Sequence, residues 1–130
     1  MSVLLVDDDD ISNYLNKRVV EKSGYFKRVD ICNSAQAAIN MLTQRKEADE
    51  PLPRLILLDI MMPVMDGFAF LEELNRRFAD SHKHFKVAML TSSLTSEDMN
   101  KAMKYPQVVA YLNKPLDKTA LEKLAGELNA

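Results

Sequence analysis

The sequence contains few of the residues that characterise several large classes of protein. It has only three glycines, Gly24, Gly67 and Gly126, so it lacks the glycine-rich loop that cradles phosphate in P-loop and dinucleotide-binding domains. Its lone cysteine, Cys32, cannot form an internal disulfide. No apolar stretch approaches the ~20 residues that cross a bilayer. A net charge of −2 gives no general affinity for nucleic acid or for an anionic membrane.

Length and composition predict a single domain. The chain has 130 residues, 47% of them hydrophobic, which suits one buried core and leaves no room for a second. Met1 and Ser2 lead directly into an apolar run without a signal-peptide pattern. Together with the unpaired cysteine, this start indicates a cytoplasmic protein, and Cys32 itself is expected to be a small buried residue.

Five short apolar runs alternate with segments of helical period. This alternation predicts an α/β fold, with a parallel sheet covered by helices on both faces. Runs of mainly apolar residues suit strands that are buried on both sides. The expected strands are residues 3–6, 28–32, 55–58, 87–90 and 108–112.

The segments between the strands are expected to form helices whose apolar stripes face the core. Ser34 and either Asp9 or Asp10 are candidate N-caps, and Gly24 is a candidate C-cap. Thr95 and Asp98 match a capping box, in which Asp98 reaches back to the Thr95 amide. The stripes are Ile11, Tyr14, Leu15 and Val19; Ala35, Ala38, Ile39 and Leu42; Phe68, Leu71, Leu74 and Phe78; Met99, Ala102 and Met103; and Leu121, Leu124 and Leu128.

Four of the expected strands lead into polar residues. Asp7 and Asp8 follow the first strand, Asp59 the third, Thr91 the fourth, and Lys114 comes shortly after the fifth. Ligands of an open parallel sheet bind at the carboxyl ends of its strands, so these side chains are expected at one edge. Carboxylates ~5 Å apart repel by roughly 3 kcal/mol per pair at an effective dielectric of ~20, so such a site needs cations. Lys114 supplies one, and carboxylate ligands suit Mg²⁺ as another.

Four motifs, LLVDDDD, LILLDIMMPVMDG, VAMLTSS and YLNKP, resemble in this order the motifs of the receiver domain of two-component response regulators. The resemblance extends from Val3 to the last helix, so residues 1–130 are expected to form a receiver domain without an output domain. It implies a flavodoxin-like, doubly wound sheet of five parallel strands in the order 2-1-3-4-5 with five helices. It also implies a cis peptide bond between Lys114 and Pro115, which turns Lys114 toward the phosphate.

The resemblance implies a role for each acidic residue. Asp59 resembles the phospho-accepting aspartate. Asp7 and Asp8 resemble the acidic pair that binds Mg²⁺, with Asp59 and the main-chain carbonyl of Met61 as further ligands. The metal is expected to be required for phosphorylation and to contribute modestly to folding.

Other matching positions imply a switch. Thr91 and Lys114 resemble the residues that contact the phosphoryl group, and Tyr111 resembles the aromatic switch residue that rotates inward from solvent. The expected phosphoryl donor is the phosphohistidine of a sensor histidine kinase or of a phosphotransfer protein. The expected output is a protein partner bound at the face of the fourth helix, fifth strand and fifth helix. Nucleic acid and membrane are not expected as direct partners, and the chain is expected to be a monomer or a phosphorylation-dependent dimer.

Two features differ from the family pattern. The connection at residues 104–108 is one residue longer than in many receivers, so the sequence does not predict its conformation. The aspartates also continue to Asp9 and Asp10, and we assign Asp7 and Asp8 to the metal.

Three other classes of protein share part of this pattern. Haloacid-dehalogenase-like phosphatases are enzymes that also use a strand-end aspartate with Mg²⁺, and Asp7 to Asp9 contain their D-x-D spacing. Ile11 stands where that motif usually has threonine, so the expectation is a protein that catalyses only its own phosphorylation and dephosphorylation. A receiver fold used only for docking and a nucleotide-binding flavodoxin-like domain are further alternatives. His82 and His84 are expected in a solvated loop at residues 80–86 rather than in a metal site.

Overall fold

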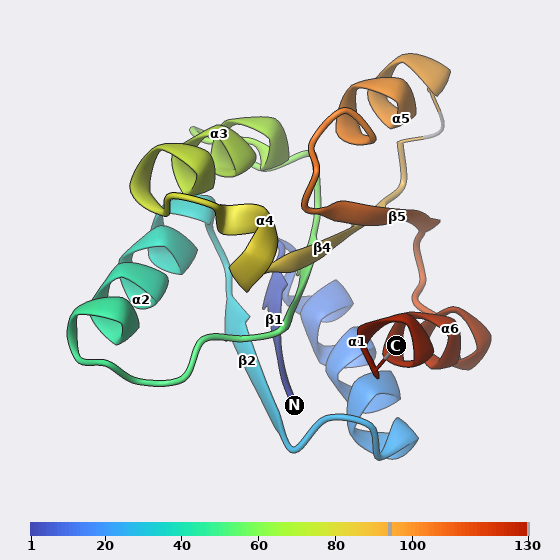
Figure 1. Ribbon diagram of the computed structural model, residues 1–130. Coiled ribbons are helices and arrows are strands. Elements are labelled where there is room, and N and C mark those ends of the chain that lie inside the picture. Colours follow the sequence, from blue (N-terminus) through green and yellow to red (C-terminus); the bar gives the residue numbers. More distant parts are fainter. Residues whose placement is uncertain (94, 130) are drawn as a thin grey trace.

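The computed structural model describes residues 1–93 and 95–129 as one α/β domain (Figure 1). Five parallel strands form one sheet in the order β2-β1-β3-β4-β5, which confirms the expected flavodoxin-like order. Within the described residues there are six helices, one more than expected. The elements are β1 (Ser2–Val6), α1 (Asp10–Ser23), β2 (Arg28–Cys32), α2 (Ala35–Glu47), β3 (Leu55–Leu58), α3 (Gly67–Arg77), α4 (Ser81–His84), β4 (Lys86–Thr91), α5 (Ser96–Ala102), β5 (Val108–Asn113) and α6 (Lys118–Asn129).

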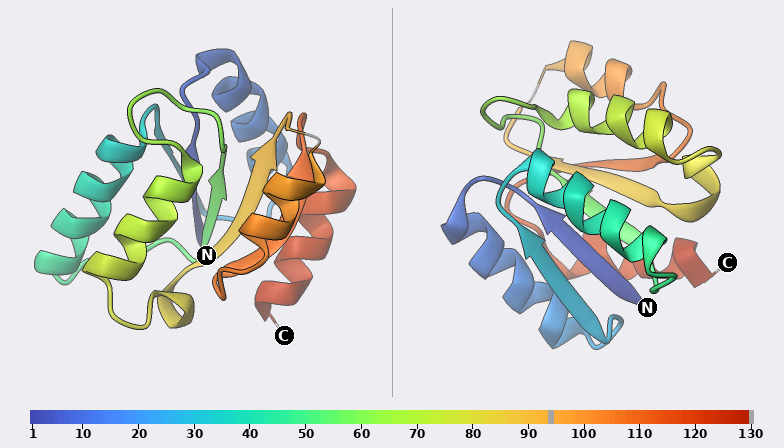
Figure 2. Two further views of the ribbon diagram at one scale, coloured as in Figure 1. Left: turned by 90° about the horizontal axis from the view of Figure 1, so that it is seen from above. Right: turned by 90° about the vertical axis from the view of Figure 1, so that its left-hand side faces the viewer.

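Two hydrophobic clusters lie on opposite faces of the sheet because successive strand residues point to opposite sides. Leu4 and Val6 of β1 join the cluster under α2, α3 and α5. Val3 and Leu5 join the cluster under α1 and α6. Figure 2 shows these two layers of helices on either side of the strands. No helix in the described part of the chain is long and apolar enough to cross a membrane.

The strand predictions hold to within a residue or two. Residues 28–32 and 55–58 match β2 and β3, while β1, β4 and β5 extend beyond the expected ends. As a result Thr91 and Asn113 are paired strand residues rather than loop residues. Thr91 is therefore held by the sheet itself.

Most expected helix stripes and caps are also confirmed. The stripes of α2, α3 and α6 are buried. Ser34 caps α2, Asp9 caps α1, and Gly24 ends α1 with a φ of 77°, a conformation that favours glycine. Cys32 is buried as expected.

Three of the four residues of the apolar stripe expected to bury α1 face solvent instead, so the prediction is wrong for them, while Val19 packs against the core. Ile11, Tyr14 and Leu15 are 71%, 58% and 50% exposed. The opposite face is buried instead, and two of its residues bind loops at the edge of the sheet, partners that a helical period cannot reveal. The buried residues of α1 are Asn13, Asn16 and Val20.

Helix α5 also differs from expectation. Its Ala102 is buried, but Met99 and Met103 are 42% and 49% exposed, because a helix of seven residues covers little of the sheet. Thr95 caps the helix by accepting from the Asp98 amide over 3.2 Å. The Asp98 carboxylate accepts from the Ser93 hydroxyl over 2.7 Å. The second contact of the expected capping box uses the peptide between residue 94 and Thr95, and residue 94 lies outside the described residues.

The additional helix, α4, lies in the segment expected to be a loop. Ser81 is buried, and its hydroxyl donates to the Asn75 side-chain oxygen over 2.6 Å. The side-chain amide of Gln107 donates to the same oxygen over 2.9 Å. Asn75 therefore connects α4 with the segment at residues 104–108. His82 and His84 are exposed on this turn, as expected of solvated residues.

Candidate functional site

Two aspartates lie side by side where β1 and β3 end. Val6 and Leu58 are partners in the sheet, and Asp7 and Asp59 are the next residue of each strand. The Asp59 amide donates to the Val6 carbonyl over 3.0 Å. Pairing therefore continues one residue past β3 and fixes Asp59 at the edge of the sheet.

Lys114 follows the edge strand β5, and its side chain reaches these two aspartates. Its amide donates to the Thr91 carbonyl over 3.0 Å, which anchors the residue after β5 to β4. Its ammonium lies 2.6 Å from Asp7 Oδ2 and 3.2 Å from Asp59 Oδ2. The peptide bond from Lys114 to Pro115 is cis, as predicted.

Asp7, Asp8 and Asp59 can hold a metal ion together. Each offers a carboxylate oxygen, and these oxygens all lie within 4.8 Å of one another. Two of the aspartates are buried and Asp8 is exposed, which leaves an open side for water or substrate. Such hard oxygen donors fit Mg²⁺, which typically takes one or two carboxylates together with waters and a phosphate oxygen.

The other two aspartates of the quartet belong to the start of α1. Asp9 accepts from the Ile11 amide over 3.0 Å and from the Ser12 hydroxyl over 2.9 Å, so its carboxylate caps the helix. Asp10 is the first residue of the helix and is exposed. The structure therefore separates Asp7 and Asp8 from the aspartates that begin the helix.

Burial shapes the electrostatics of the site. Burial and the nearby charge of Asp7 raise the pKa of Asp59, and Lys114 only partly offsets them. Burial opposes the charged form of Lys114, but its hydrogen bond to Asp7 and the charges of both aspartates outweigh burial and raise its pKa. The lysine is thus held as a cation beside a carboxylate that is hard to ionise.

Ser93 connects Thr91 to Tyr111 and to α5. Its amide donates to the Thr91 hydroxyl oxygen over 3.2 Å, and its carbonyl accepts from the Tyr111 hydroxyl over 3.1 Å. Its own hydroxyl binds Asp98 in α5. Thr91 is fully buried, so the contacts of Ser93 lead from the buried site to the surface.

Tyr111, the residue that resembles the aromatic switch, lies on β5 beside the Thr91 region. Its ring is partly buried and packs against the larger core cluster, the one under α2, α3 and α5. The hydrogen bond to the Ser93 carbonyl holds the Tyr111 hydroxyl in this inward position.

The loop between β3 and α3 packs tightly behind Asp59. The Gly67 amide donates to the Ile60 carbonyl over 2.9 Å. A Cβ at position 67 would lie 2.5 Å from the carbonyl oxygen of Asp59. This close approach requires glycine. The Met61 amide lies 3.4 Å from Asp59 Oδ1, and the Met61 side chain is exposed at the rim of the site.

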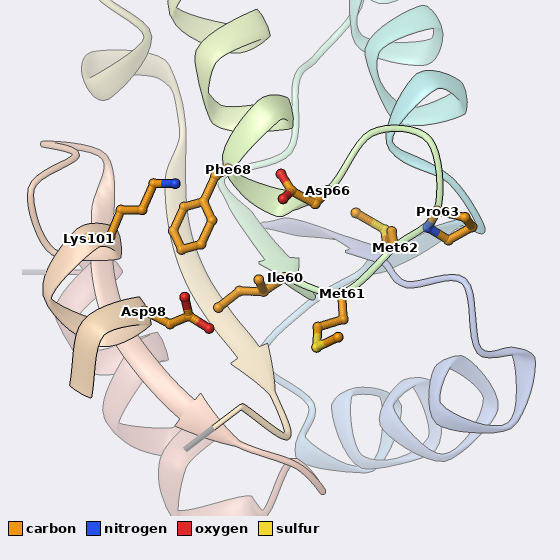
Figure 3. Close-up of a pocket in the computed structure, with 8 residues that line it drawn as sticks. All are labelled: Ile60, Met61, Met62, Pro63, Asp66, Phe68, Asp98 and Lys101. Atoms are coloured by element: carbon orange, nitrogen blue, oxygen red, sulfur yellow. The ribbon is translucent and has the colours of Figure 1, made fainter. Parts of the chain in front are cut away.

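A groove separates this loop from α5 (Figure 3). The Lys101 ammonium lies 4.3 Å from the centre of the Phe68 ring, a cation–π contact that connects α5 with α3. The groove is lined by Ile60, Met61, Met62, Pro63, Asp66, Phe68, Asp98 and Lys101. Helix α5 thus faces the β3–α3 loop across this groove.

Three residues that contact the site were not found from the sequence. Asn13 and Asn16 lie under Asp7 and the Lys114 loop, and Ser93 lies between Thr91 and Tyr111. The spacing of the two asparagines, three apart on a helix, was a detectable sign of a polar inner face. Ser93 had no such sign because its role depends on its main-chain groups.

Comparison with known proteins gives consistent matches. The sequence model of the response regulator receiver domain matches residues 3–125. The chain is 29% identical over 126 residues to the probable methanogenesis regulatory protein FilR2 of Methanothrix harundinacea, covering 97% of this chain and 79% of that protein. It is 30% identical over 119 residues to the chemotaxis protein CheY of Halobacterium salinarum, covering 92% of this chain and 88% of that protein. The crystal structure of a two-component response regulator from Cytophaga hutchinsonii superimposes with a TM-score of 0.92 at 34% identity, covering 98% of this chain and 96% of that chain.

These matches agree with the geometry of the site. The phosphatase alternative finds no support among them, and Asp9, the second aspartate of its D-x-D spacing, caps α1. Receiver domains are generally not enzymes in the turnover sense. With a matching family model over residues 3–125 and the same strand order, the chain belongs to the family of response regulator receiver domains.

Proposed function

We propose that this protein is a phospho-accepting response regulator receiver. Asp59 takes a phosphoryl group from the phosphohistidine of a sensor histidine kinase or a phosphotransfer protein, with Mg²⁺ held by Asp7, Asp8, Asp59 and the Met61 carbonyl. The phosphorylated form then binds a protein partner through the face of α5, β5 and α6. Because α4 was not expected, α5 and α6 are the fourth and fifth helices of the sequence prediction. The change at this face passes through Thr91 and Tyr111.

One observation carries the proposal. A buried aspartate stands at the end of the central strand β3, with a lysine ammonium 3.2 Å from its carboxylate and two further aspartates within metal-binding distance. A carboxylate that served only the fold would be better satisfied without two neighbours of the same charge. The cluster is instead suited to a ligand that brings both negative charge and a cation.

The residues support a simple transfer reaction. An Asp59 oxygen attacks the phosphorus atom, the new O–P bond forms as the N–P bond of phosphohistidine breaks, and the electron pair of that bond returns to the imidazole. Phosphoryl transfer passes through a loose transition state, so positioning and charge neutralisation supply most of the catalysis. Lys114 and the Thr91 hydroxyl would bind phosphoryl oxygens. When bound, Mg²⁺ would neutralise further charge on the transferred group.

Exposed apolar residues beside the site favour a protein as the donor. Ile11, Tyr14 and Leu15 project outward from α1, which begins shortly after Asp8. On the other side of the site, Met61 is exposed in the loop after β3. Contiguous exposed apolar side chains often mark protein-binding surfaces.

The test is phosphate incorporation into Asp59. Wild-type protein with Mg²⁺ should acquire acid-labile phosphate from acetyl phosphate and, faster, from a cognate kinase. Asp59→Asn should acquire none, whereas the matched variant Asp10→Asn, which also removes one carboxylate, should behave as the wild type. Undiminished labelling of Asp59→Asn would refute the assignment, and labelling at Asp7 would favour the phosphatase-like chemistry.

A further inference from the structure

The inner face of α1 carries two amides where apolar side chains would be expected. Asn13 and Asn16 are 2% and 4% exposed. They are three residues apart and therefore neighbours on one face of the helix. Each contacts a different loop of the candidate site.

Asn13 holds the loop that follows β1. Its side-chain amide donates to the main-chain carbonyl of Asp7 over 2.8 Å. The Asp7 carboxylate in turn accepts from the Asp9 amide over 2.9 Å and lies 2.6 Å from the Lys114 ammonium. The hydrogen bond from Asn13 thus sets the direction in which the chain leaves the sheet just before Asp8.

Asn16 holds the loop that follows β5. Its side-chain oxygen accepts from the Leu116 amide over 3.4 Å. Leu116 is two residues after Lys114, so this contact restrains the loop that brings the lysine to Asp59. At 3.4 Å the bond is long and therefore weaker than that of Asn13.

Packing alone does not explain Asn13. Its side-chain oxygen is buried and accepts no hydrogen bond from residues 1–93 and 95–129. A buried amide with one unpaired atom is less favourable than an apolar side chain of the same shape. Local departures from optimal packing are typical of functional sites.

We infer that Asn13 and Asn16 are positioning residues for the phosphorylation site. Through them α1 holds the loops of Asp7 and Lys114 where both side chains meet Asp59. Residues that orient metal ligands typically change metal affinity or activity by 10- to 100-fold when removed. The inference rests on the proposed function: the expected change in rate depends on phosphorylation of Asp59, and the expected change in affinity depends only on the Mg²⁺ site of Asp7, Asp8 and Asp59.

Asn13→Leu and Asn16→Leu test the two contacts separately. Mg²⁺ affinity is measured by titration of amide chemical shifts, phosphorylation by uptake of phosphate from acetyl phosphate, and stability by urea unfolding without Mg²⁺. Asn13→Leu should weaken Mg²⁺ binding about ten-fold. Its urea midpoint should change little, because losing the donor to the Asp7 carbonyl is offset by losing the unpaired Asn13 side-chain oxygen. Asn16→Leu should slow phosphorylation several-fold at saturating Mg²⁺, with a smaller effect on Mg²⁺ affinity.

Asn75→Leu is the control for loss of an asparagine that makes hydrogen bonds elsewhere, although Asn75 itself is exposed. It removes an asparagine that accepts from Ser81 and Gln107 near the end of α3, away from the site. This variant should lower the urea midpoint and leave Mg²⁺ affinity unchanged. If folded Asn13→Leu and Asn16→Leu proteins behave in the same way as this control, the two residues are merely structural and the inference is wrong.

Two further outcomes keep the test decisive. If a leucine variant does not fold, the alanine variant at the same position is measured, with the same expected loss of Mg²⁺ affinity or rate. If the wild type binds Mg²⁺ but takes up no phosphate, the proposed function fails. The Mg²⁺ affinity of the Asn13 variant still decides the role of Asn13.

Discussion

The Tyr111 hydroxyl donates a hydrogen bond to the main-chain carbonyl of Ser93 over 3.1 Å, and the amide of the same serine binds the Thr91 hydroxyl oxygen over 3.2 Å. A ligand can shift a conformational equilibrium only by interacting differently with its two states. A phosphoryl oxygen on Asp59 would accept from the Thr91 hydroxyl and draw it toward Asp59. Because the Ser93 amide donates to the same hydroxyl oxygen, Ser93 would move with it. Ser93 then passes the change to Tyr111 and, through Asp98, to α5.

Thr91→Ala should accept phosphate but respond poorly to it. Addition of beryllofluoride with Mg²⁺ to the wild type should shift the amide resonances of Tyr111, Ser93 and the residues of α5, and these shifts should be much smaller in the variant. Coupling of this kind is typically about 1–3 kcal/mol, which corresponds to a 5- to 150-fold change in partner affinity. Sedimentation of the same samples would show whether the wild type also forms a dimer. Unchanged wild-type resonances in α5 would rule out this route.

Asp59→Asn should make the protein more stable at neutral pH. The pKa of Asp59 in the folded state is raised above its ordinary value of 3.8, so the folded protein prefers the protonated form. The contribution of Asp59 to the free energy of unfolding is therefore lost as pH rises from about 3.8 through the raised pKa. If the gain at pH 7 is about 1 kcal/mol, Tm should rise by roughly 4 °C without Mg²⁺.

The same comparison at low pH supplies the control. Below about pH 3.8 the carboxyl is protonated in both states, so the stability advantage of Asp59→Asn should disappear. An advantage that does not depend on pH would mean that the change acts through packing rather than through charge.

Lys114→Met should bind Mg²⁺ more tightly and accept phosphate more slowly. The Lys114 ammonium lies 2.6 Å from Asp7 Oδ2 and therefore competes with a metal for that oxygen. Removing the cation should increase Mg²⁺ affinity roughly 3- to 30-fold. It should also reduce the rate of phosphate uptake, because one charge that binds the phosphoryl group is missing.

Lys118→Met is the matched control for this prediction. Its ammonium lies 3.7 Å from Glu122 on the exposed surface of α6, and a pair of this kind contributes little. Mg²⁺ affinity should not change in this variant. Weaker Mg²⁺ binding by Lys114→Met would show that the lysine organises the carboxylates rather than competing for them.

Gly67→Ala should destabilise the protein and disturb Asp59. The new Cβ would lie 2.5 Å from the Asp59 carbonyl oxygen and 3.0 Å from Ile60 Cα, so the main chain must move. We expect a loss of about 1–3 kcal/mol in the free energy of unfolding and slower phosphate uptake by the folded fraction. Gly126→Ala is the comparison: within the part of the chain that the structure describes, nothing lies within 4 Å of its Cβ position in α6. That change should stabilise the helix by up to about 1 kcal/mol.

Asp8→Asn and Asp10→Asn should differ in Mg²⁺ affinity although each removes one exposed carboxylate. Only Asp8 belongs to the cluster whose oxygens lie within 4.8 Å of one another. Loss of that ligand should weaken binding by at least about ten-fold, as measured by calorimetric titration. Equal affinities in the two variants would mean that the metal is held elsewhere in the quartet.

The sequence alone determined the architecture and the composition of the site. The strands are short apolar runs, and a polar residue after such a run must lie at the carboxyl edge of a parallel sheet. For that reason the positions of Asp7, Asp59 and Lys114 along the chain were enough to place them at one site. The caps at Ser34 and Gly24 were equally local, since each depends on the residues next to it.

The tertiary structure decided how the helices face the sheet and how the switch is set. Ile11, Tyr14 and Leu15 have a helical period, but the opposite face of α1 is buried, and its Asn13 and Asn16 bind loops at the sheet edge. The partner of Asn16 is Leu116, and that of Tyr111 is Ser93. Such bonds join residues far apart in the chain, and they form only after the sheet has brought those loops together. A periodic pattern records local geometry and carries no information about such partners.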